Sequence, residues 1–372
     1  MDWPTSRLGW KRGDQPPHSK TLPRRLGTSL DGLADDPRRC WSGTGRQLGI
    51  WRNGSQQLGS ASQFGPLTTN PHPHPNMILL GIGDEAGASL DAQIRATQTL
   101  GWHHLEARNV EVPGHAKDNL HEVCDKAFET AVQRLEAGGI QVYCFGSTIM
   151  NWAKKLETPF EFTLAEVRRA IPRMQRLGTK FVRIMSYKPG AEDSTIPPEV
   201  FRRVNEVTRM FLDAGLQPVH ENCMNYGGMS WQHGLELLEH CPGLKWVFDT
   251  ANPVFNPDRS KAKPWPRQDA WEFWTHVRDH VAHIHIKDAT WNPAKNDADY
   301  NWPGEGQGRV REILQDAFAR GYDAGISIEP HLAAVFHDAS VKTSPEAAFD
   351  SFVEYGRRLE RLIAELRPAP AK

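Results

Sequence analysis

Short apolar runs alternate with longer amphipathic stretches along the chain from Met77 onward. Eight of the runs are rich in the β-branched and aromatic residues typical of strands, and apolar positions recur with helical spacing between them. The predicted strands are residues 77–83, 103–108, 141–147, 181–187, 217–223, 245–251, 282–288 and 325–331. A regular alternation of this kind predicts βα units built around a parallel sheet.

Two of the predicted helices carry recognisable end signals. Thr163 and Glu166 match a capping box, which predicts that a helix starts there, and Gly178 supplies its stop. The helix predicted for residues 197–216 begins with two prolines and is closed by Gly215. These signals place helices between successive strands, as βα units require.

Eight strands alternating with eight helices predict an α/β protein whose fold is a (β/α)8, or TIM, barrel spanning residues 77–366. The alternative is a doubly wound open sheet, but "GIGDEAG" in the first βα unit lacks the glycine spacing of a dinucleotide-binding loop.

Residues 1–76 differ sharply in composition from the rest of the chain. They are dense in Gly, Pro, Ser and Arg, contain no Glu and show no sustained apolar period, which predicts a disordered N-terminal extension.

The charge and composition of the chain argue against nucleic acid and membranes as partners. The net charge of the 372 residues is -1, which gives no electrostatic footprint for nucleic acid, and no run of about 18 apolar residues predicts a membrane span. The five cysteines are scattered without a CxxC pair, so no zinc knuckle is indicated and a cytoplasmic setting is the default prediction. The sequence does not decide whether the protein is a monomer or a homo-oligomer.

Polar side chains stand at the C-terminal ends of the last four predicted strands, where TIM barrels carry their active sites. They are Glu221, Asp249, His285 and Glu329. Each acid alone is more often a loop anchor or helix cap, and a lone histidine is more often a buried structural residue. Four possible ligands on four successive strands nevertheless favour a site for one divalent ion. Three oxygens and one nitrogen suit Mn²⁺, with Mg²⁺ or Co²⁺ as alternatives.

In the stretch "HIHIKD", residues 283–288, polar and apolar side chains alternate along the predicted strand. Period-two alternation puts His283, His285 and Lys287 on one face of the strand and the isoleucines on the other. His285 is the predicted ligand, and His283 lies one step deeper on the same face. Lys287 is predicted to point towards the metal, where it acts as a catalytic acid or forms a salt bridge with Asp288 or Glu329.

The strand endings "VHEN", "VFDT", "HIHIKD" and "SIEP", followed by "PGEGQGR", resemble the sugar phosphate isomerase/epimerase superfamily. These xylose-isomerase-like TIM barrels include ketose 3-epimerases and inosose dehydratases. The resemblance implies that one divalent metal is bound by Glu221, Asp249, His285 and Glu329. It also implies that the two glutamates serve as acid and base.

The chain departs from the ketose 3-epimerase pattern at two places. Asn252 stands where those enzymes usually have a substrate-binding histidine after the Asp ligand, and Lys287 and Asp288 replace a Gly-Glu pair. The ending "HxHxKD" is closer to the dehydratase-like branch. Simple epimerisation of a ketose is therefore in question, whereas metal-assisted chemistry on a keto sugar or polyol is still expected.

The chemistry of such a site can also be argued from its residues. A divalent ion chelated by a carbonyl and a neighbouring hydroxyl acidifies the adjacent C–H and stabilises the resulting enediolate. Glu221 and Glu329 then remove and return a proton, which predicts an isomerase or epimerase. If the intermediate instead expels water or a glycosidic oxygen, the enzyme is a lyase or dehydratase, with Lys287 as the acid.

Further residues are expected to form a pocket for a small, unphosphorylated carbohydrate. Aromatic faces stack on the apolar side of sugar rings while polar groups hold the hydroxyls. The candidates at or after strand ends are Glu106, Arg108, Asn252, His283, Trp152, Trp231 and Trp291.

Two rival functions fit the same fold. An abasic-site endonuclease needs more histidine ligands at the strand ends and a basic face, neither of which the sequence offers. A noncatalytic sugar-binding barrel would lack a metal ligand, whereas all four residues are present.

Overall fold

Eight parallel strands form the sheet of the computed structural model, which describes residues 77–333 and 344–367. The strands are β1 (Ile78–Gly81), β2 (His104–Ala107), β5 (Gln141–Phe145), β6 (Phe181–Ile184), β7 (Gln217–Glu221), β8 (Lys245–Asp249), β9 (Val281–Ile286) and β12 (Gly325–Ile328). Every strand begins and ends within one residue of its predicted range or inside it. The predicted disorder of residues 1–76 lies outside the described residues.

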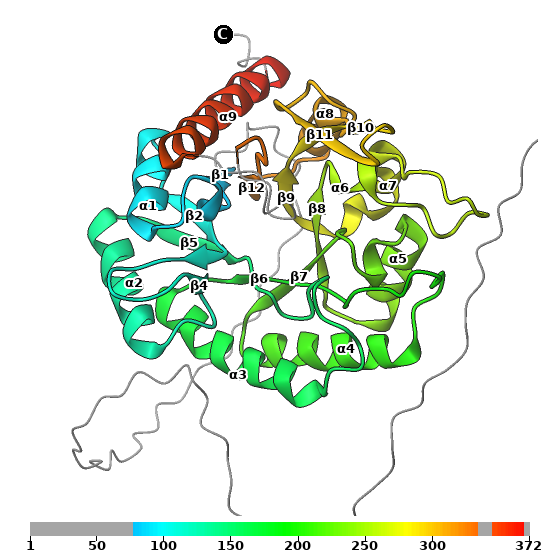
Figure 1. Ribbon diagram of the computed structural model, residues 1–372, viewed down its shortest axis with the longest axis horizontal. Coiled ribbons are helices and arrows are strands. Elements are labelled where there is room, and N and C mark those ends of the chain that lie inside the picture. Colours follow the sequence, from blue (N-terminus) through cyan, green and yellow to red (C-terminus); the bar gives the residue numbers. More distant parts are fainter. Residues whose placement is uncertain (1–76, 334–343, 368–372) are drawn as a thin grey trace, which may run out of the picture. The chain divides into compact units, whose positions relative to one another are not determined.

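The sheet order β1-β12-β9-β8-β7-β6-β5-β2 is that of a barrel in which each new strand pairs with the previous one. A parallel bridge between Ile82 and Glu106 joins the first two strands, so the ring is nearly closed. Figure 1 shows the ring of strands with helices around it. The (β/α)8 barrel predicted from the sequence is therefore confirmed.

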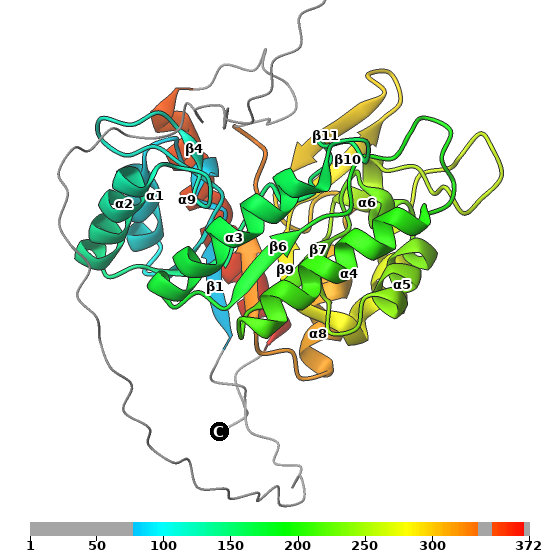
Figure 2. The same ribbon diagram turned by 90° about the horizontal axis from the view of Figure 1, so that it is seen from below.

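Among the described residues, eight helices have eight or more residues. Figures 1 and 2 show helices on the outside of the barrel. They are α1 (Leu90–Thr99), α2 (Asp125–Gly138), α3 (Phe160–Leu177), α4 (Pro198–Asp213), α5 (Trp231–His240), α7 (Ala270–Val277), α8 (Val310–Ala319) and α9 (Pro345–Leu366). Within the described residues, none of the helices has the length and apolar character needed to cross a bilayer.

The predicted start of α3 is wrong. The helix begins at Phe160, directly after Pro159, which makes no side-chain cap, so Thr163 lies inside the first turns. The Thr163 hydroxyl lies 3.2 Å from the Tyr187 hydroxyl, and Glu166 pairs with Lys154. The predicted C-terminus is correct, because Gly178 adopts a left-handed conformation with φ of 67°.

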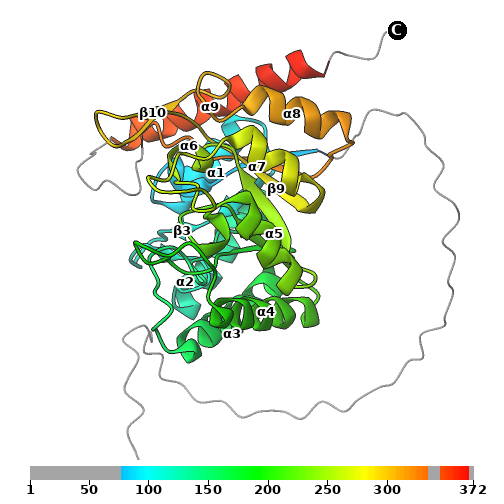
Figure 3. The same ribbon diagram turned by 90° about the vertical axis from the view of Figure 1, so that its right-hand side faces the viewer.

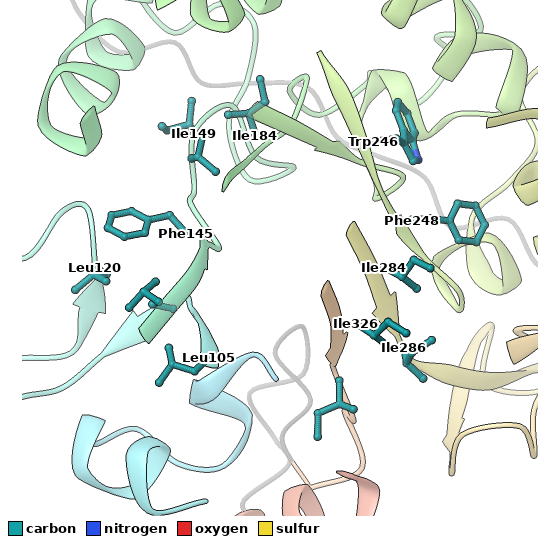
Figure 4. Packing of buried hydrophobic residues seen from close by; sticks show 14 of the residues in the cluster. Leu105, Leu120, Phe145, Ile149, Ile184, Trp246, Phe248, Ile284, Ile286 and Ile326 are labelled. Atoms are coloured by element: carbon teal, nitrogen blue, oxygen red, sulfur yellow. The ribbon is translucent and has the colours of Figure 1, made fainter. Parts of the chain in front are cut away.

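The two faces of β9 pack against different surroundings. Ile284 and Ile286 are fully buried and belong to the apolar layer between strands and helices, near Phe248 and Trp274. Figure 4 shows Ile284 and Ile286 on the side of the strand that faces away from the barrel axis. Burying each isoleucine stabilises the fold by about 1.5–3 kcal/mol, which fixes the strand register. His283 and His285 consequently face the barrel interior.

Most of the additional short elements follow a strand of the barrel, whereas η3 precedes β9. A hairpin of β10 (Asp288–Asn292) and β11 (Asp297–Asn301) packs on α6 (Asn252–Phe255) through Ala251, Val254, Ala289 and Ala298. Figure 3 shows β10 beside α6. The remaining short elements are β3 (Asn109–Val110), paired with β4 (Asp118–Asn119), and the 3-10 turns η1 (Gly83–Glu85), η2 (Tyr226–Gly228) and η3 (Arg278–His280).

Candidate functional site

The four predicted metal ligands meet at one point of the barrel. Glu221 and Asp249 are the last residues of β7 and β8, His285 is the penultimate residue of β9, and Glu329 directly follows β12. All four are at most 4% exposed, and one ligand atom from each lies within 4.8 Å of the other three. This geometry arises because the C-terminal ends of neighbouring parallel strands lie side by side.

Glu106 on β2 orients the imidazole of His285. The Nε2 of His285 donates to Glu106 Oε2 at 2.9 Å, which leaves Nδ1 facing the carboxylates at 3.8 Å from Glu221 Oε1 and 4.0 Å from Glu329 Oε2. Burial alone would raise the pKa of Glu106, but His285 and His283 beside it hold that pKa well below its usual range. A carboxylate that fixes the far nitrogen of a histidine is the usual partner of a metal-bound imidazole.

Glu106 and His283, which the sequence predicts to bind substrate, lie within strands β2 and β9. Both are fully buried and lie outside the cavity lining. His283 is held 2.9 Å from Glu106 Oε2 through Nε2 and 3.0 Å from the Gly325 carbonyl through Nδ1. Inward-facing residues one step below a strand end fill the barrel core, so these two residues support His285.

Three cations contact the candidate ligands. Arg183 Nη1 lies 3.1 Å from Glu221 Oε2, and Arg108 Nη1 donates to Glu329 Oε1 at 2.8 Å. Lys287 Nζ lies 3.0 Å from Asp249 Oδ2 and 3.1 Å from Glu329 Oε2. In each glutamate, one oxygen is therefore held by an arginine and the other faces His285. The cations reduce the repulsion between the buried carboxylates.

The pKa values of the carboxyl groups reflect this balance between burial and charge. Burial would raise the pKa of Glu329, but Lys287, His331 and Arg108 hold it well below its usual range. Burial raises the pKa of Asp249 to about 7, since only Lys287 and His285 oppose it. Among the candidate ligands, Asp249 is thus the carboxylate whose burial is offset least by neighbouring positive charge.

The arrangement fits one divalent cation. Within the described residues, His285 Nδ1 is buried without a hydrogen-bond partner, whereas Glu221 Oε2 and Asp249 Oδ2 each contact a cationic side chain, Arg183 and Lys287 respectively. Asp249 Oδ1 accepts from the backbone N–H groups of Ala251 and Asn252, which aims Oδ2 at the centre of the set. Buried polar atoms are rarely left unpaired, so the free ring nitrogen beside three carboxylates points to a cation. Three carboxylates and one imidazole suit Mn²⁺, Mg²⁺ or Co²⁺.

A cavity of about 200 Å³ opens above this cluster. Among the predicted site residues, Glu221, Glu329, Lys287, Arg108, Trp152 and Asn252 line it. Asn252 Nδ2 donates to Glu221 Oε1 at 3.1 Å, which holds that carboxylate from the side opposite Arg183. The structure therefore brings most of the predicted site residues together around one space.

Two of the predicted tryptophans lie elsewhere. Trp231 is not in a loop at the barrel mouth: Ser230 caps α5, so Trp231 is the first helical residue and stacks on His276 with ring centroids 3.7 Å apart. Trp291 is on β10, with the Arg267 guanidinium 3.7 Å from its ring centroid, and lines a separate surface cavity. Neither ring faces the cavity above the metal ligands.

Sequence reasoning missed several lining residues: Asn109, Thr148, Asn151, Arg183, Met185, Cys223, Met224, Phe255, Tyr300 and His331. Arg183 could have been found from the sequence. It interrupts the apolar strand "FVRIMS" at a position where alternation places its side chain inward, and a charged residue inside a barrel needs a partner.

The Gly-rich segment after β11 is anchored by Asp288. The two carboxylate oxygens of Asp288 accept four backbone N–H bonds of 2.8 to 2.9 Å, from Ala289, Gly304, Gly306 and Gly308. A Cβ at Gly306 would lie 2.4 Å from Asp288 Oδ1, so no larger residue fits there without a shift. Asp288 therefore has a structural role next to the site.

Three carboxylates and an imidazole lie together at the strand ends of a (β/α)8 barrel. The fold and these residues place the protein among the TIM barrels with a candidate metal centre. The chain belongs to the xylose isomerase-like TIM barrel family, whose model matches residues 94–355. No curated protein matches the chain.

Several solved structures share the fold. A xylose isomerase-like TIM barrel protein from Mycobacterium smegmatis, in complex with magnesium, is 15% identical with a TM-score of 0.54, covering 78% of this chain and 98% of that chain. A probable 3-DHS dehydratase from Bacillus anthracis is 16% identical, with a TM-score of 0.54 and coverages of 77% and 98%. D-allulose 3-epimerase from Methylomonas sp. is 13% identical, with a TM-score of 0.52 and coverages of 78% and 98%. At these low sequence identities, the similarity shows a common fold and nothing more.

Proposed function

We propose that the protein is a divalent-metal-dependent enzyme that removes a proton next to the carbonyl of a small keto sugar or polyol derivative. The observation that carries the proposal is the convergence of Glu221, Asp249, His285 and Glu329 beneath a cavity of about 200 Å³. An epimerase and a probable dehydratase among the proteins of similar fold support an enzyme that acts on a sugar or a related keto compound.

The four residues would hold Mn²⁺, Mg²⁺ or Co²⁺, which, when bound, polarises a carbonyl and acidifies the neighbouring C–H. Glu221 and Glu329 approach from strands separated in the sheet by β8 and β9, so they flank the site from two sides. One glutamate takes the proton and the other returns it, and the product is an isomer or epimer of the substrate. Arg183 and Arg108 keep the two carboxylates ionised and oriented.

Elimination is the second candidate reaction, and the position of Lys287 favours it. Its ammonium group is buried beside Asp249 and Glu329 and also lines the cavity. A cation there can donate a proton to a departing hydroxyl or glycosidic oxygen after Glu221 has removed the proton from carbon. The product would be the dehydrated or cleaved keto sugar.

The cavity supports a small substrate. Its volume lies below the roughly 300–1,000 Å³ typical of drug-sized pockets, so it suits a single ring or short chain. Trp152, Phe255 and Tyr300 offer apolar faces, while Asn109 and Asn252 offer amide groups for hydroxyls. We therefore keep an unphosphorylated carbohydrate as the proposed substrate.

Solvent exchange tests the proposed reaction before the substrate is known. The metal-loaded protein is incubated in D₂O with a panel of keto sugars, inososes and 3-keto glycosides, and each compound is examined by NMR. Deuterium at the carbon next to the carbonyl supports proton abstraction, and loss of a hydroxyl or glycosidic group identifies elimination. Absence of exchange and of product across the panel, with metal bound, contradicts the proposal.

A further inference from the structure

Lys287 occupies an unusual place for a residue beside a metal centre. Lys287 directly follows β9, and its side chain is buried, with the residue only 3% exposed. Nζ lies 3.0 Å from Asp249 Oδ2 and 3.1 Å from Glu329 Oε2, two of the four candidate ligands. The ammonium group therefore uses the same oxygens that a divalent cation would need.

The backbone at Lys287 is fixed from both sides. Thr250 Oγ1 accepts from the Lys287 N–H at 3.1 Å and donates to the Lys287 carbonyl. On the other side, Asp288 is tied to the Gly-rich segment by four N–H bonds. Because these bonds hold the backbone, Lys287 can respond to a cation that enters the cluster through its flexible side chain.

The pairing of charges shows what Lys287 contributes to the ligand set. Glu221 has Arg183 on one oxygen, and Glu329 has Arg108. Within the part of the chain that the structure describes, Lys287 is the one lysine or arginine that contacts Asp249. A buried carboxylate without a counter-charge is strongly destabilising, so Lys287 stabilises Asp249 among the buried carboxylates.

We propose that Lys287 is a built-in counter-ion that holds Asp249 and Glu329 in place and competes with the divalent cation for their oxygens. The proposal rests on the metal centre of the proposed function and adds a role for this residue in metal binding. When a cation takes those oxygens, the ammonium group loses its partners and is left facing the cavity, which it already lines. Metal binding and the presentation of Lys287 to substrate are thereby coupled.

Metal affinity tests the proposal without any substrate. Mn²⁺ binding is measured by isothermal titration calorimetry for the full chain and for Lys287→Met, which keeps most of the side-chain length and removes the charge. Lys287→Gln is a second neutral variant in case the first does not fold. Lys295→Met is the matched control, because Lys295 is exposed on the adjacent hairpin and pairs with Asp299.

Removal of a competing cation should lower the Kd for Mn²⁺ at least tenfold in both Lys287 variants and leave it unchanged in the control. The metal-free Lys287 variants should also melt at a lower temperature than the metal-free wild type, and Mn²⁺ should raise their Tm by more. A Kd equal to or higher than that of the wild type, in variants that fold, overturns the proposal while the metal centre stands. If neither the wild type nor the variants bind Mn²⁺, Mg²⁺ or Co²⁺, the proposed function fails as well.

Discussion

Replacing Glu106 with glutamine should weaken metal binding although Glu106 touches neither the cavity nor the cation. In the structure, Glu106 Oε2 accepts from His285 Nε2 at 2.9 Å, which fixes the ring so that Nδ1 faces Glu221 and Glu329. Glutamine keeps one acceptor oxygen but loses the negative charge that makes the imidazole a stronger ligand. Changes to such supporting carboxylates typically reduce metal affinity by about 10- to 100-fold.

The retained acceptor places the expected effect near the lower end of that range, about tenfold, or roughly 1.4 kcal/mol. Calorimetric titration with Mn²⁺ at fixed pH and ionic strength measures it. Glu305→Gln is the control, since Glu305 is exposed and pairs with Arg358 on the outer surface. An unchanged Kd in a folded Glu106→Gln protein would refute the assignment of His285 Nδ1 as the ligand atom.

Two further predictions concern stability. Gly306→Ala should lower the free energy of unfolding by about 1–3 kcal/mol, because the added Cβ would lie 2.4 Å from Asp288 Oδ1. Urea denaturation measures this change. An unchanged free energy of unfolding would argue against the anchoring role of Asp288. Burial lowers the pKa of His220 to about 3, so the folded state keeps this ring neutral while the unfolded chain takes up a proton as pH falls below about 6.5. This contribution to stability is therefore present above that pH and falls by about 1.4 kcal/mol per pH unit below it, down to the folded pKa. His220→Gln should remove that part of the slope in acid unfolding curves, and parallel curves for the two proteins would contradict it.

The sequence predicted the strands and the convergence of the four candidate ligands because both follow from local rules. Period-two alternation decided which face of "HIHIKD" looks inward, and the ends of parallel strands share one edge of the barrel. Lys287 was placed correctly on the His285 face, and its ion pair with Glu329 was one of the alternatives considered.

The contacts that long-range packing decides could not be predicted. Glu106 and His285 are far apart in the chain, and nothing local to either indicates that the carboxylate holds the ring. Trp231 was predicted to lie in a loop after a strand, whereas Ser230 caps a helix that begins at Trp231. The anchoring of Gly306 and Gly308 by Asp288 likewise depends on a loop returning to the end of β9.

Four side chains at the strand ends are proposed to hold one divalent cation. Anomalous scattering from crystals of the protein grown with Mn²⁺ tests this metal site most directly. We expect a single peak within coordination distance, roughly 2.0–2.6 Å, of Glu221, Asp249, His285 Nδ1 and Glu329. Absence of a peak at saturating Mn²⁺, or a peak at the neighbouring cluster of Glu85, Glu329 and His331 instead, would contradict it.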